Sequence, residues 1–147
     1  MRRRWIIVAL ALIAFVAVTL VLGRWLTTEN TERDRVTDLL QAQLAGDADA
    51  MLAQLDAACV HRPACVGTVR ENAERLQGPG DLEIVAYDSG TGYSLGPGSA
   101  PTRVVWRAGD RLTTVQCVGV RREGNIVAGT SVSLTGLSAP IDREGAC

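Results

Sequence analysis

The four cysteines are the residues whose chemistry the sequence indicates most directly. They are Cys59, Cys65, Cys117 and Cys147, and all of them follow a long apolar stretch near the N-terminus. An even number of cysteines in the exported part of a chain is typical of disulfide bonds. Four cysteines allow three pairings. We expect Cys59–Cys65, which closes a short loop, and Cys117–Cys147, which fastens the C-terminal tail to the rest of the chain.

The loop between Cys59 and Cys65 also contains His61, the single histidine of the chain. These three residues are of zinc-ligand types, but their spacing is not that of a C-x2-C pair and no second cluster completes a site. A lone histidine in a tight loop is more typical of a solvated surface residue than of a general base. The sequence therefore favours a disulfide here, and predicts no metal and no other cofactor.

Catalytic patterns are missing from the rest of the sequence. It contains no recognisable Ser-His-Asp, Cys-His, H-E-x-x-H or phosphate-loop pattern. Cysteines that form disulfides do not act as nucleophiles. We therefore predict no catalytic residues and a protein that is not an enzyme.

The apolar stretch near the N-terminus, residues 5–26, predicts a transmembrane helix. Its segment Ile6–Leu22 holds no charged residue, and as a helix it spans about 25 Å, close to the thickness of a bilayer core. Trp5 and Trp25 flank this segment, where interfacial aromatic residues usually lie. The lipid bilayer is therefore a predicted partner, with Trp5 and Trp25 as membrane-anchor residues.

The charges around this stretch predict its orientation. Three arginines, residues 2–4, precede it, whereas only Arg24 closely follows it. By the positive-inside rule, residues 1–4 are a cytoplasmic stub and the domain after the helix lies outside the cell membrane. A cleaved signal peptide, including one of the twin-arginine type, is the alternative. The sequence favours an uncleaved signal anchor because the apolar core is long and residues 21–25 offer no small-residue cleavage site.

The charge distribution also bears on partners. All sixteen acidic residues lie after the apolar stretch, and the formal net charge is −1. Nucleic-acid-binding domains are usually basic, so nucleic acid is not an expected partner. Five arginines nevertheless gather within residues 101–122. They indicate either a basic sheet face for anionic headgroups or an acidic partner, or an ordinary solvated face, and we favour the solvated face.

After the anchor, the sequence predicts a polar tether over residues 27–30, followed by helices. The first helix begins near Glu32 and ends at Gly46. A second helix begins after Asp47 or Asp49, with Ala58 and Cys59 extending its apolar stripe, and residues 66–76 form a third helix. Apolar side chains recur at helical spacing in the first two helices and are expected in the core: Val36, Leu39, Leu40, Leu44, Met51, Leu52 and Leu55.

From Leu82 onward, apolar and polar residues alternate, which predicts an antiparallel sheet. We expect Leu112, Val118 and Val120 to face the core and Cys117 to face outward. Gln116 then faces inward and needs a hydrogen-bond partner. The predicted strands cover residues 82–87, 93–95, 102–108, 111–121 and 126–134.

This order of elements resembles the nuclear transport factor 2-like (cystatin-like) superfamily. The segment Leu39–Leu52, a helix that ends in Ala-Gly-Asp and re-enters through an Ala-rich helix, carries the resemblance. The closing strands, with Thr113 and Val115–Val118, and the final cysteine look like those of exported, membrane-anchored members from high-GC bacteria. The resemblance implies an α+β domain over residues 31–137, in which two or three helices pack on a curved antiparallel sheet. Residues 138–147 follow as a tail.

Two functions are compatible with these features. The first, which we expect, is a non-enzymatic extracytoplasmic domain, tethered to the membrane, that binds a protein partner of unknown identity in the cell envelope. The second, which the resemblance implies, is a small-molecule carrier or isomerase-like enzyme with a pocket between helices and sheet. Tyr87 and Asp88 are the first candidates for polar groups in such a pocket. The second function requires an open pocket between helices and sheet. It would be contradicted if core side chains filled that space, namely those of Met51, Leu55, Trp106 and Val118.

Overall fold

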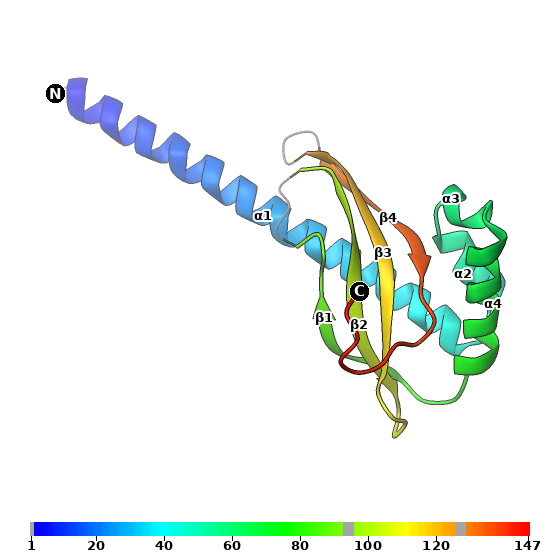
Figure 1. The fold of residues 1–147 in the computed structure, drawn as a ribbon. Coiled ribbons are helices and arrows are strands. Elements are labelled where there is room, and N and C mark those ends of the chain that lie inside the picture. The colour runs from blue at the N-terminus through cyan, green and yellow to red at the C-terminus, as the bar shows by residue number, and fades with distance from the viewer. Residues whose placement is uncertain (1, 93–95, 126–128) are drawn as a thin grey trace.

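Helices and an antiparallel sheet form an α+β structure (Figure 1). The computed structural model describes residues 2–92, 96–125 and 129–147, but not the side-chain surroundings of residues 2, 3, 24, 25 and 125. The sheet has the order β1-β2-β3-β4, with each pair of neighbours antiparallel. The elements are α1 (Arg2–Leu44), α2 (Ala48–Gln54), α3 (Ala57–Val60), α4 (Pro63–Leu76), β1 (Leu82–Asp88), β2 (Gly98–Ala108), β3 (Thr114–Asn125) and β4 (Gly129–Leu137).

Helix α1 has two parts with different surroundings. Figure 1 shows its N-terminal part projecting away from the other elements and its C-terminal part crossing one face of the sheet. The projecting part is apolar, with a mean hydropathy of 3.0 over its most apolar window, and none of that window is buried. Among the described residues, α1 is the helix that is long and apolar enough to cross a membrane. Trp5 at its start is 75% exposed, while the side chain of Trp25 lies outside the described part.

Residues 27–31 belong to α1, so the predicted tether and the predicted helix start near Glu32 are wrong. Thr and Asn cost up to about 0.7 kcal/mol each relative to Ala in a helix, which is why this segment reads as a break. Two effects offset that cost. The next turn of the helix docks on the sheet through Glu32, and an unbroken helix keeps the backbone amides of this segment hydrogen-bonded. The hydroxyls of Thr27 and Thr31 donate to carbonyls four residues back, at 2.8 and 2.9 Å.

The core lies between the C-terminal part of α1 and the sheet. The predicted inward positions Val118 and Val120 are buried there, and so are Val132 and Leu134 of β4, which alternate in the same way. Leu112, in contrast, is 84% exposed, because β3 begins only at Thr114 and residue 112 lies in the preceding turn. The same core contains Val36, Leu39, Leu40, Leu44, Met51, Leu55, Trp106 and Val118.

The predicted third helix and the predicted strands among the described residues match observed elements apart from their ends, whereas the second helix ends at Gln54 and a separate short helix, α3, contains Ala58 and Cys59. Gly46 follows α1 with a φ of 73°, a conformation that favours glycine. Asp47 caps α2, since its Oδ1 accepts a hydrogen bond from the amide of Ala50 at 2.9 Å. Helix α4 begins at Pro63 rather than residue 66, and β2 begins at Gly98 rather than residue 102. The predicted strand over residues 93–95 and the start of the one at residue 126 lie outside the described residues.

Candidate functional site

Glu32 lies on the face of α1 that packs against the sheet, and its side chain is fully buried. It precedes Val36 by one helical turn and shares that face with Leu40 and Gln43. Burying a carboxylate without partners costs several kcal/mol. Its neighbours therefore decide what this residue can do.

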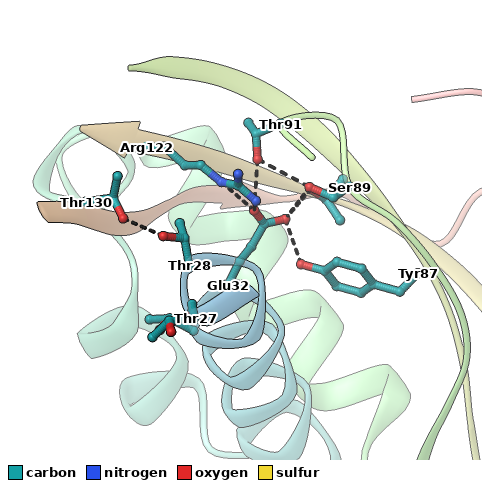
Figure 2. Close-up of polar contacts among 10 residues, drawn as sticks. Thr27, Thr28, Glu32, Tyr87, Ser89, Thr91, Arg122 and Thr130 are labelled. Carbon is teal, nitrogen blue, oxygen red and sulfur yellow. Dashed lines mark hydrogen bonds and ion pairs between the residues drawn. The ribbon is translucent and has the colours of Figure 1, made fainter. Parts of the chain in front are cut away.

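Both oxygens of the Glu32 carboxylate accept hydrogen bonds, and the donors come from three strands and a loop (Figure 2). Oε1 accepts from the hydroxyls of Tyr87 (2.8 Å), Ser89 (2.8 Å) and Thr102 (3.1 Å). Oε2 accepts from the hydroxyl of Thr91 (2.8 Å) and from Arg122, through Nε (3.0 Å) and Nη2 (2.6 Å). We call this set the Glu32 cluster: Glu32, Tyr87, Ser89, Thr91, Thr102 and Arg122.

Arg122 supplies the opposite charge. It lies on β3 in the inward phase of Val118 and Val120, and its side chain is 3% exposed. A guanidinium that donates two hydrogen bonds to a carboxylate forms one of the stronger contacts available to a protein. The pair therefore joins α1 to a strand 90 residues away in the sequence.

Burial and hydrogen bonding act in opposite directions on Glu32. Burial alone would raise the pKa of its carboxyl, but the hydrogen bonds from Tyr87, Arg122, Thr91 and Ser89 outweigh it and hold the pKa below its ordinary value. The pKa of Tyr87 is raised, first by burial and then by the charge of Glu32 and the hydrogen bond to it. At neutral pH the cluster therefore contains an ionised carboxylate and a neutral tyrosine.

This arrangement is suited to holding elements together rather than to catalysis. A general base needs a free lone pair directed at a substrate, whereas both oxygens of Glu32 already have several donors. The lowered pKa also makes this carboxylate a weak base. We therefore interpret the Glu32 cluster as a latch that fixes α1 to the sheet.

A second polar cluster lies further along the same face of α1. The side-chain amides of Gln43 and Gln116 donate to each other, at 3.0 and 3.2 Å. Trp106 Nε1 also donates to Gln116 Oε1 (2.8 Å), and Gln116 Nε2 donates to the carbonyl of Ser138 (3.0 Å). Asn72 of α4 donates to the same carbonyl at 2.8 Å. The predicted inward position of Gln116 is thus confirmed, and its partners are now identified.

The disulfides are Cys59–Cys65 and Cys117–Cys147, the pairing that we expected. Beyond β4, the tail continues along β3: the amide of Ile141 donates to the carbonyl of Val115 at 2.8 Å. Val115 has the outward phase of Cys117 and yet is only 2% exposed. The tail therefore covers part of the outer face of the sheet, and the Cys117–Cys147 bond holds its end there.

The remaining predicted candidates do not form a site. His61 is exposed at the end of α3, and the sulfurs of Cys59 and Cys65 are bonded to each other and so cannot ligate zinc. Among the described residues, no group of three His, Cys, Asp or Glu side chains is placed to hold a metal ion. Tyr87 points at Glu32, whereas Asp88 is exposed and lies 3.8 Å from Arg103. The strand alternation therefore separates these two neighbours.

The five arginines of residues 101–122 each have partners within the protein. Arg107 pairs with an exposed acid of β1, Glu83, at 2.6 Å, and Arg121 lies 3.4 Å from Asp56. Arg111 donates to the carbonyls of Leu76 and Gln77 at the end of α4. Arg103 donates to carbonyls of the tail, and Arg122 binds Glu32. These contacts support a structural use of the arginines over a binding face for anionic headgroups.

One feature of the sequence indicates the position of Glu32. Glu32 is in phase with the apolar stripe of Val36 and Leu40, so a continuous helix brings it onto the core face. The identity of its partners had no local signal, because Arg122, Tyr87 and Thr91 lie in strands and a loop more than fifty residues away.

The hollows near the core open at the surface. One groove is lined by Leu76, Trp106 and Leu112 among others, and another by Leu44, Pro79 and Leu82. Neither groove includes a residue of the Glu32 cluster. No protein-family model matches this chain, and no curated protein and no solved structure is significantly similar to it.

Proposed function

We propose that the protein is a single-pass membrane protein whose extracytoplasmic domain binds a protein partner of the cell envelope and catalyses no reaction. The observation that carries this proposal is the continuity of α1 from its apolar part into the core. A rigid connection sets the angle and height at which a surface is presented, and so reduces the ordering cost of binding a partner in the same membrane. An enzyme or carrier that binds a freely diffusing small molecule would not need such a rigid connection to the membrane.

The Glu32 cluster supports the same proposal. A helix that only anchored a domain could end at the membrane and continue as a flexible linker. Here the first turns beyond the apolar part carry the fully buried Glu32, which Arg122 and Tyr87 bind. The latch prevents rotation of the domain about α1.

The proposed side of the membrane follows from two features. Disulfides persist in oxidising compartments, and two are present here. Residues 2–4 are arginines, which favours a cytoplasmic N-terminus. Protease added outside intact cells, or to cells whose outer barrier is opened, should digest the domain; protection would contradict this orientation.

We include in the proposal that the domain is of the nuclear transport factor 2-like type, because helices precede a four-stranded antiparallel meander. The small-molecule function associated with that resemblance receives less support. Met51, Leu55, Trp106 and Val118 all belong to the core packed between helices and sheet, which counts against a ligand pocket at these side chains.

The proposal can be tested by photo-crosslinking in native membranes. A photoreactive amino acid at exposed Leu112 and at other exposed positions should give a reproducible crosslink to one protein. Replacing residues 27–30 with glycine and serine should weaken this crosslink by freeing the domain, whereas replacing them with alanines, which keep the helix, should preserve it. Monomeric recovery in mild detergent without crosslinks from any of these positions would contradict the proposal.

A further inference from the structure

Because α1 continues unbroken from its apolar part into the domain, it fixes how far the nearest part of the sheet lies from the proposed membrane. We propose that the end of the sheet where β3 and β4 meet lies in the phospholipid headgroup layer of the membrane that α1 spans. We call this end the membrane-facing rim and define it by the described residues Glu123, Gly124, Gly129, Thr130 and Ser131. The inference rests on the proposed membrane anchoring and adds a second lipid contact to it.

The position of the rim follows from a contact between two hydroxyls. Oγ1 of Thr28 on α1 and Oγ1 of Thr130 on β4 are 2.6 Å apart (Figure 2). With a helical rise of 1.5 Å per residue, Thr28 lies only about 3 Å beyond Leu26, the end of the predicted span. The headgroup layer on each side of a bilayer core is about 5–7 Å thick. Thr130 is therefore at the level of the headgroups.

The Glu32 cluster fixes the rim in this position. Glu32 lies about 9 Å beyond Leu26 along the helix, just outside the headgroup layer. Its contacts with Arg122 hold β3 at the residue that directly precedes the rim. Because α1 has no break between Leu26 and Glu32, the domain cannot move away from the membrane without loss of these contacts.

The chemistry of the rim indicates which lipids it contacts. Its exposed described residues are glycine, serine and one acid, Glu123, and the neighbouring Arg122 is buried against Glu32. Attraction to anionic lipid contributes about 1 kcal/mol for each lysine or arginine near the surface, and the described rim presents no such residue. The contact therefore needs only zwitterionic headgroups and is insensitive to salt.

Fluorescence quenching in vesicles tests this placement on the full chain. A fluorescent amino acid is incorporated at Ser131, or, as a matched control, at exposed Asp110 in the turn between β2 and β3, and the protein is reconstituted in phosphatidylcholine that carries a nitroxide on its headgroup. Asp110 adjoins Arg111, which donates to carbonyls at the end of α4. This end lies beside the C-terminal end of α1, away from its apolar part, because the amide of Gly78 donates to the carbonyl of Leu44. We expect severalfold stronger quenching at Ser131 than at Asp110. Equal quenching in protein that floats with the vesicles overturns the inference, whereas protein that does not float with them overturns the membrane anchoring as well.

A change in the length of α1 supplies the second test. Insertion of seven helix-forming residues between Leu26 and Thr27 adds about two turns and raises the domain by about 10 Å with nearly the same rotation. Quenching at Ser131 should then fall to the level of Asp110, and unchanged quenching would overturn the inference. Replacing part of the phosphatidylcholine with phosphatidylglycerol, or raising the salt concentration, should leave the quenching unchanged. A requirement for anionic lipid would count against the proposed chemistry.

Discussion

Among the described side chains of α1, two polar ones are buried on the face that packs against the sheet, Glu32 near the apolar part and Gln43 near the C-terminal end. Both are fully buried, and both bind side chains of the sheet. Glu32 is charged and is paired with the guanidinium of Arg122. Gln43 is neutral and exchanges two amide hydrogen bonds with Gln116.

The two buried pairs fix the same helix at two points, but they differ in how much stability is lost when one partner is removed and in whether that stability depends on pH. A buried ion pair has a large desolvation cost and a large attraction, so the loss of one partner is severe. A buried pair of amides has both a smaller desolvation cost and a weaker attraction. The charged cluster also depends on pH, and the neutral cluster does not. We expect the Glu32 cluster to hold the angle of the apolar part of α1, and the cluster of Gln43, Trp106 and Gln116 to hold the far end of α1 together with the tail.

Removal of Arg122 should cause the largest loss of stability among the variants that separate the two clusters. Arg122→Ala leaves the Glu32 carboxylate buried without its counter-charge, and we expect a loss of about 3–5 kcal/mol in the free energy of unfolding. Urea unfolding of the full chain in detergent measures it. Arg107→Ala is the matched control on the same sheet, because the Arg107–Glu83 pair is exposed and such pairs contribute about 0–1 kcal/mol. Similar losses in the two variants would show that the buried Arg122–Glu32 pair contributes no more to stability than an exposed ion pair.

Acid should lower the contribution of the Glu32 cluster to the unfolding free energy, because a protonated Glu32 is neutral. We expect this change to be smaller than the loss caused by Arg122→Ala. The folded pKa of Glu32 is below its ordinary value of 4.5, so its contribution to stability is present above pH 4.5 and is lost as the pH falls through the lower folded pKa. The difference in unfolding free energy between the wild type and Glu32→Gln should therefore shrink in acid. Parallel pH profiles of the two proteins would contradict the ionised latch.

The same cluster should weaken in alkali for the opposite reason. The folded pKa of Tyr87 is above its ordinary value of 10.0, so the unfolded chain loses this proton first and stability falls as the pH rises past 10.0. Tyr87→Phe should remove this part of the pH dependence. Unfolding monitored by circular dichroism across the alkaline range measures it, and an unaltered alkaline slope in the variant would count against the Tyr87–Glu32 contact.

Disruption of the neutral cluster should cost less than the loss of Arg122. Gln116→Leu leaves the buried amide of Gln43 and the indole nitrogen of Trp106 without their partners, for which we expect about 1–3 kcal/mol. The loss should be the same at pH 4 and pH 7, in contrast to the Glu32→Gln difference. A loss that varies with pH would indicate coupling between the two clusters.

The smallest predicted effect concerns the contact nearest to the apolar part of α1. Thr28→Val keeps the shape of the side chain but removes the hydrogen bond to Thr130, for which we expect about 0.5–1.5 kcal/mol. Thr37→Val is the matched control, because the Thr37 hydroxyl donates only to the carbonyl of Arg33 within the same helix. An equal change in the two variants would indicate that the contact between α1 and β4 adds nothing to stability.

Much of the fold could be predicted because it depends on local patterns. The stripe of Val36, Leu39 and Leu40 identifies the core face of a helix wherever that helix begins. Strand alternation places Gln116 inward and Cys117 outward with no knowledge of the partner strands. The disulfide pairing could be anticipated because one pair is close in the sequence and the other fastens the last residue.

The site and its junction with the apolar part of α1 depend on contacts between distant residues, which local sequence patterns do not encode. Local propensity made residues 27–30 look like a tether, and only the docking of Glu32 onto the sheet makes one helix of the whole segment. Glu32 and Arg122 read as surface charges in the sequence, yet tertiary structure makes them a buried pair, since 90 residues separate them. The sequence by itself thus determined the apolar helix, the core positions and the cysteines, which follow from composition and period. The tertiary structure decided how that helix joins the domain, because that depends on the geometry with which two distant charges meet.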